Sequence, residues 1–242
     1  MPKIQLEVCI DDPQSVNILN TCDVQRIEVC GHLSIGGVTP PLPLVRYVNE
    51  YSTIPFRVMI RVRAGLFDYT ETEWKMMYEE ARAIKEVCEL NPLWEGFVIG
   101  ALKPNGSEID VDALKKFAQE LCLSESGRHL TLHRCVDILP QSNMKTEIQR
   151  CLQAIPVIDA VLTSGGSSDG AHQGVHTLSS MMDLPIMVGS GVNEKTLPLL
   201  RAQLPQVAWW HGSFSRVVEA DNRFHFGERS RVDAAKIATS RN

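Results

Sequence analysis

IQLEVC (residues 4–9) and QRIEVC (residues 25–30) are the two stretches that decide the fold. Each is a short apolar run bounded by polar and turn-forming residues, as buried strands are. Runs of the same kind follow at 56–61, 95–100, 128–133, 158–163, 185–189 and 207–212. Helix-like stretches separate them, most clearly at 71–89, 110–122 and 193–203, and Asp12 before Pro13 is typical of a helix start that would run to about Thr21. Strands that alternate with helices pair in parallel through right-handed crossovers.

We therefore predict an α/β fold of the (β/α)8 TIM-like barrel type, built as a single domain over residues 1–242. Residues 214–242 are expected to form a C-terminal loop and a last helix near 231–238. An open doubly wound sheet is the alternative. It is less favoured because eight near-evenly spaced repeats suit closure and no GxGxxG follows the first run.

Composition narrows the class of partner. The net charge of −5 and pI near 5.8 provide no basic face for nucleic acid or an anionic membrane. No apolar run reaches membrane-spanning length, and the N-terminus has no signal-peptide pattern. The seven cysteines form no spaced framework, which favours free thiols in a reducing compartment. We expect a cytoplasmic protein.

Polar residues alternate with apolar ones along the strands. In the first run, Leu6 and Val8 share one face and Glu7 and Cys9 share the other. Because surrounding helices demand the apolar face, the polar face must fill the barrel lumen. The residues expected there are Glu7, Glu28, Arg57, Arg61, Arg63, His133 and Asp159. Buried charges need partners, so they form either a structural salt-bridge network or a ligand site at the C-terminal strand ends.

The repeated LEVC and IEVC place Cys9 and Cys30 at matching positions of neighbouring strands. Such strands lie about 4.8 Å apart, so both thiols could reach one soft ion, and two thiolates suit Cu(I). The alternative is that each cysteine is a small buried apolar residue.

Glycine-bearing loops follow several strands. The segment 31–41 is long enough to form a lid over the barrel mouth. LTSGGSSDG (162–170) and VGSGVN (188–193) place small residues where the backbone could meet an anion. With HGS (211–213), VGSGVN either forms a phosphate cradle, as barrels often do after the last two strands, or these loops are simple turns. The residues expected to contact an anion there are Ser164, Gly189, Gly191 and His211.

Together these pieces resemble one known family. LEVC, RIEVC, GGVTP, MIRVR, LHR with Asp137, LTSGG, GSGV and His211 are similar to the CutC copper-homeostasis family, from Leu6 to about Ser213. The resemblance implies a cytoplasmic TIM-like barrel that takes part in copper handling, with Cys9 and Cys30 as candidate Cu(I) ligands. It also implies a polar lining of Glu7, Glu28, Arg61, Arg63, His133 and Arg134. The chain departs from the family pattern at Leu66, where an aspartate is usual.

Two functions stay open at this stage. The first is copper homeostasis, with Cu(I) bound by Cys9 and Cys30. The second is an enzyme of the lyase, isomerase or hydrolase type that acts on a small anionic or phosphorylated substrate. There Arg61, Arg63 and Arg134 would hold the anion, and acid/base chemistry would come from Glu7, Glu28 or His133. The expected partners are a copper ion or a small anionic ligand, and a second copy of the chain in a homodimer.

Overall fold

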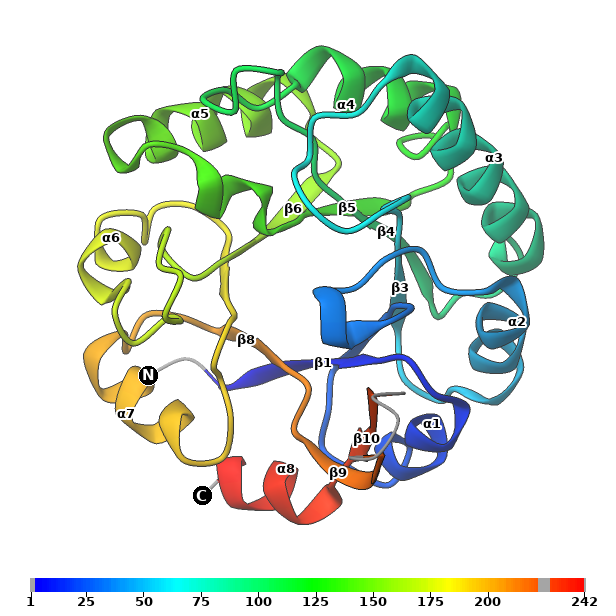
Figure 1. Cartoon of the computed structure of the whole chain (residues 1–242), viewed down its shortest axis with the longest axis vertical. Coiled ribbons are helices and arrows are strands. Elements are labelled where there is room, and N and C mark those ends of the chain that lie inside the picture. The colour runs from blue at the N-terminus through cyan, green and yellow to red at the C-terminus, as the bar shows by residue number, and fades with distance from the viewer. Residues whose placement is uncertain (1–2, 222–226, 242) are drawn as a thin grey trace.

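A computed structural model of the chain describes residues 3–221 and 227–241. Its centre is a closed barrel of parallel strands in the order β1 to β8, ringed by helices (Figure 1). The strands are β1 (Gln5–Ile10), β2 (Arg26–Val29), β3 (Phe56–Met59), β4 (Trp94–Ile99), β5 (His129–Leu132), β6 (Ile158–Thr163), β7 (Ile186–Val188) and β8 (Trp209–Gly212). The predicted barrel is confirmed, and the open sheet is excluded because β1 pairs with both β2 and β8.

The helices follow the strands in alternation. They are α1 (Pro13–Leu19), α2 (Leu42–Tyr51), α3 (Glu71–Cys88), α4 (Val111–Glu120), α5 (Gln141–Ala154), α6 (Val175–Ser179), α7 (Thr196–Gln203) and α8 (Ala234–Arg241), with 3-10 turns η1 (Leu33–Ile35) and η2 (Arg134–Ile138). Local capping residues determine where several of these helices begin. The Asp12 side chain caps α1, and Thr70 and Glu73 form a reciprocal capping box on α3. No helix in the described part of the chain is both long and apolar enough to cross a membrane.

The core lies between the barrel and its helices. Leu6 and Val8 of β1 and Ile27 and Val29 of β2 are fully buried there, on the face predicted from their alternation. Their polar neighbours Glu7 and Glu28 are buried as well, on the lumen side. The strand phase therefore puts charges inside the barrel.

The C-terminal tail differs from the prediction of a loop. It forms an antiparallel hairpin of β9 (Ser215–Asp221) and β10 (Gly227–Val232), followed by α8. The hairpin lies beside α1, where the backbone N–H of Val232 donates to the Ser15 hydroxyl at 3.2 Å (Figure 1). The tail thereby becomes a wall of the barrel mouth.

Candidate functional site

A cavity of about 900 Å³ opens at the C-terminal ends of the strands. Its floor includes Cys9, Glu28 and His211, and the loop between β2 and α2 projects over the barrel opening (Figure 1). The loop after β7 and the tail complete the walls, contributing Gly191, Asn193, Arg231 and Lys236 among others. The predicted lid segment does border the mouth, since His32, Leu33, Ser34 and Gly36 line the cavity.

Below this cavity lies the interior ion-pair network, which we define as Arg26, Arg57, Glu7, Glu95 and Asp159. Arg26 donates to Glu7, and both side chains are almost completely buried. Arg57 binds both carboxylate oxygens of Asp159, at 2.6 and 2.7 Å, and both arginines approach Glu95. The predicted inward orientation of Glu7 and Arg57 is confirmed. Glu7 does not line the cavity, so its position favours a structural role.

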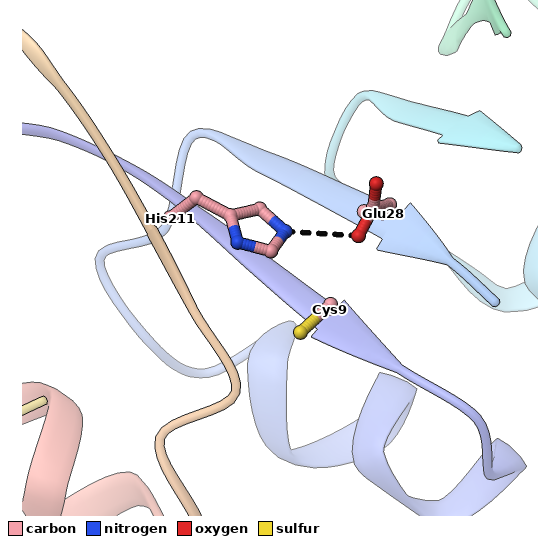
Figure 2. Close-up of side chains that lie close together, drawn as sticks. All are labelled: Cys9, Glu28 and His211. Carbon is pink, nitrogen blue, oxygen red and sulfur yellow. Dashed lines mark hydrogen bonds and ion pairs between the residues drawn. The ribbon is translucent and has the colours of Figure 1, made fainter. Parts of the chain in front are cut away.

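The cavity-floor cluster consists of Cys9, Glu28 and His211, which come from β1, β2 and β8 (Figure 2). His211 Nε2 lies 2.9 Å from Glu28 Oε2 and 3.8 Å from Glu7 Oε1. Burial lowers the pKa of His211, but the carboxylate of Glu28 and the Cys9 thiol outweigh burial and hold that pKa well above its usual value. His211 was predicted to contact an anion, yet its ring is held by a carboxylate.

The two cysteines do not occupy matching positions. Cys9 is the register partner of Glu28, so the repeated motifs are offset by two residues. Closure of a barrel requires such a stagger between strands, which the likeness of the motifs could not reveal. Both thiols nevertheless pack in one buried cluster with Met59 and Val98. Burial raises the pKa of both thiols.

The Arg61 side chain forms hydrogen bonds with the loops around it. Its guanidinium donates to the carbonyl oxygens of Gly36, Gly37 and Gly65 and stacks over Phe67, 4.7 Å from the ring centre. It therefore braces the loops after β2 and β3 and does not line the cavity.

The expectation that Arg63 points into the lumen is wrong. Its side chain is 38% exposed and pairs with Glu73, the residue that caps α3. The reason is that β3 ends at Met59, so strand alternation no longer governs residue 63.

The loop after β6 is occupied by an internal carboxylate. Asp137 accepts from the backbone N–H groups of Ser164 and Gly166, at 2.9 and 3.1 Å, and from Arg134 Nε at 2.8 Å. The Ser164 hydroxyl donates to the carbonyl of Ser167, and Ser164 is fully buried. Asp137 and the Ser167 carbonyl therefore already take the donors that Ser164 and its loop would have offered to the predicted anion.

Four other predicted site residues lie at or next to the cavity: Gly189, Gly191, Arg134 and His133. A Cβ on Gly189 would come within 2.5 Å of a terminal methyl of Leu162 and 3.4 Å of His211, so glycine leaves room for these side chains under the cavity floor. Gly191, Arg134 and His133 line the cavity itself. Burial lowers the pKa of His133 to about 3, helped by nearby Arg61 and Arg134, so its ring is neutral at ordinary pH.

Sequence reasoning missed several cavity residues, among them Met59, Arg231 and Lys236. Met59 shares the strand phase of Arg57 and could have been found from alternation. Arg231 reaches the mouth because the tail folds back as a hairpin, for which the sequence carried no clear signal. Lys236 lies on the last helix, which was predicted near 231–238 without a place in the site.

The similarity to known proteins extends over the whole barrel. The CutC family model matches residues 4–215. A CutC family protein of Rhizobium meliloti (strain 1021) is 33% identical over 252 residues, which cover 100% of this chain and 96% of that protein. A copper homeostasis protein cutC homolog of Caenorhabditis elegans is 33% identical over 221 residues, covering 88% of this chain and 81% of the relative.

Solved structures agree with the fold. CutC from Streptococcus agalactiae superposes with a TM-score of 0.75 at 25% identity, covering 87% of this chain and 98% of that one. A phosphoribosyl anthranilate isomerase from Thermococcus kodakaraensis superposes with a TM-score of 0.61 at 12% identity, covering 98% and 96%. The second likeness shows a shared barrel and nothing of the activity.

Proposed function

The chain belongs to the CutC family, and from that premise we propose that it serves copper homeostasis by binding Cu(I) through Cys9 and Cys30. The Caenorhabditis elegans relative carries copper homeostasis in its name. The resemblance expected from the sequence is confirmed at the level of the family. The seven cysteines of this chain are all free thiols. Free thiols suit the cytoplasm, where we place this function.

The observation that carries the proposal is a group of soft ligands at the ends of β1, β2 and β3. We call Cys9, Cys30 and Met59 the sulfur cluster. A Cβ on Gly37 would lie 2.9 Å from Met59 Sδ and 3.5 Å from Cys30 Sγ, so the loop passes close over the sulfur atoms. Thiolates and thioethers are the ligands that Cu(I) prefers.

Access to the sulfur cluster comes from one side. Cys9 and Met59 line the cavity, whereas Cys30 lies behind them and is fully buried. An ion entering from the mouth would meet Cys9 and Met59 first and reach Cys30 by displacing its proton. Binding would thus be coupled to deprotonation of buried thiols.

Anaerobic titration with Cu(I) against a competing chelator tests this proposal. We expect one Cu(I) per chain, and an affinity at least 100-fold lower in Cys9→Ser and in Cys30→Ser. Cys122→Ser is the matched control, because that thiol is exposed and should leave the affinity unchanged. Unchanged affinity in the Cys9→Ser/Cys30→Ser double variant would contradict the site.

A second candidate function is an enzyme acting on a small anionic substrate. A cavity of about 900 Å³ is much larger than one ion needs and falls in the range of small-molecule sites. Arg134, Arg231 and Lys236 line it beside Glu28 and neutral His133. Cations would hold an anion, and the carboxylate and imidazole would supply acid/base chemistry.

Ligand-dependent melting tests the second candidate. We expect phosphate or a small dicarboxylate to raise the melting temperature of the wild-type chain, and Arg134→Leu to reduce that rise. Crystals soaked with the same anion should show it near Arg134 and Lys236. Absence of any shift across a panel of phosphorylated and carboxylated compounds would speak against a substrate.

A further inference from the structure

Three different kinds of metal ligand meet at the floor of the cavity. One ligand atom from each of Cys9, Glu28 and His211 lies within 4.8 Å of the other two (Figure 2). Barrel geometry causes this convergence, because β1 is flanked by β2 and β8. Cys9 is the register partner of Glu28, and Glu7, two residues earlier, is the partner of His211. All three side chains are buried and all three line the cavity.

The carboxylate of this cluster is incompletely satisfied. Glu28 is 2% exposed, and while its Oε2 meets His211, its Oε1 is buried without a hydrogen-bond partner. The buried arginines are already used, since Arg26 pairs with Glu7 and Arg57 with Asp159. Within residues 3–221 and 227–241, no lysine or arginine ion pair to Glu28 is found. A buried carboxylate oxygen without a hydrogen-bond partner would be satisfied by a bound cation.

We propose that Cys9, Glu28 and His211 form a binding site for a divalent zinc-type ion, with a remaining coordination position open to the cavity. A thiolate, a carboxylate and an imidazole are all ligands of Zn²⁺. Around one ion at about 2.0–2.3 Å, such atoms lie about 3–4 Å from one another, so small side-chain rotations from the present positions suffice. Three protein ligands with an open fourth position are typical of catalytic zinc.

Charge and ligand softness separate this site from the copper proposal. With the Cys9 proton displaced by the ion, the thiolate and the Glu28 carboxylate would carry two negative charges, which a divalent ion neutralises and Cu(I) does not. Cu(I) favours sulfur over a carboxylate, so it would turn to Cys30 and Met59. Cys9 is common to both sets, but Glu28 and His211 belong only to the divalent site. The inference goes beyond copper homeostasis and does not depend on it.

Titration of the full chain with Co²⁺, followed by displacement with Zn²⁺, tests the site under reducing, anaerobic conditions. We expect one Co²⁺ per chain with a thiolate-to-cobalt charge-transfer band that Zn²⁺ abolishes. Glu28→Gln and His211→Gln should each lower Zn²⁺ affinity at least 100-fold. Cys30→Ser is the matched control, which should keep Zn²⁺ affinity within about twofold while losing Cu(I) if the copper proposal holds.

The outcomes are decisive even if a variant fails to fold. Anomalous diffraction from wild-type crystals soaked with Zn²⁺ should show a peak bonded to Cys9, Glu28 and His211. No stoichiometric Co²⁺ binding, a peak elsewhere, or equal loss of affinity in Cys30→Ser would overturn the proposal. Loss of Cu(I) binding alone would leave it standing.

Discussion

Arg57 offers the sharpest test of the charged barrel interior. It is 1% exposed, binds both Asp159 carboxylate oxygens at 2.6 and 2.7 Å, and donates to the Thr131 hydroxyl at 2.8 Å. Arg57→Met keeps an unbranched apolar side chain but lacks the guanidinium, so it removes all three bonds. Breaking a buried ion pair by removing one partner costs about 3–5 kcal/mol. Asp159 is 39% exposed and can rehydrate in part, so we expect the lower end, about 3 kcal/mol.

Urea unfolding followed by circular dichroism measures this loss. Arg63→Met is the matched control, because Arg63 is also ion-paired but 38% exposed, and it should lose about 1 kcal/mol or less. Adding Asp159→Asn to Arg57→Met should recover part of the stability, since it removes the charge left without a partner. Equal losses of unfolding free energy in Arg57→Met and Arg63→Met would refute the reasoning that a buried ion pair contributes more to stability than an exposed one.

Three further predictions concern stability. His133 has a pKa of about 3 when folded against 6.5 as its ordinary value, so stability is full above pH 6.5 and falls by about 1.4 kcal/mol per pH unit toward pH 3. His133→Gln should flatten that part of the pH profile, and an unchanged slope would contradict it. Thr70→Ala should cost about 1 kcal/mol in urea unfolding through loss of the α3 cap; no loss would argue against the capping box. Gly96→Ala should abolish soluble expression, because its Cβ would lie 2.1 Å from the carbonyl oxygen of His129. Gly106→Ala, with open space and a positive φ, should cost only about 1–2 kcal/mol, and similar behaviour of the two variants would refute the clash.

Strand phase was predictable because it depends on a period of two residues. That period alone placed Glu7, Glu28 and Arg57 inside the barrel, where they are buried. The stagger between strands was not predictable, because it is a property of the closed barrel and leaves no mark on either strand. Cys9 therefore faces Glu28 across the strands, where the likeness of the two motifs suggested Cys30.

Loop residues escaped prediction for a different reason. Beyond the end of β3, the direction of Arg63 is set by its partner Glu73 on the next helix. Ser164 was predicted to meet an anion, but a carboxylate from the preceding loop, Asp137, reaches its backbone first. Such contacts depend on where distant segments meet, and local pattern does not carry that information.

The distribution of charge inside the barrel indicates where a ligand belongs. TIM-barrel interiors are normally filled by aliphatic layers, so every charge here must be compensated. In the interior ion-pair network Arg26 pairs with Glu7 and Arg57 with Asp159, and both arginines approach Glu95, which is one-third exposed to solvent. In the cavity-floor cluster, Glu28 pairs with His211 through one oxygen and keeps its other oxygen buried without a hydrogen-bond partner among the described residues. This unpartnered carboxylate oxygen lies at the level that opens to the cavity, where a cation can enter.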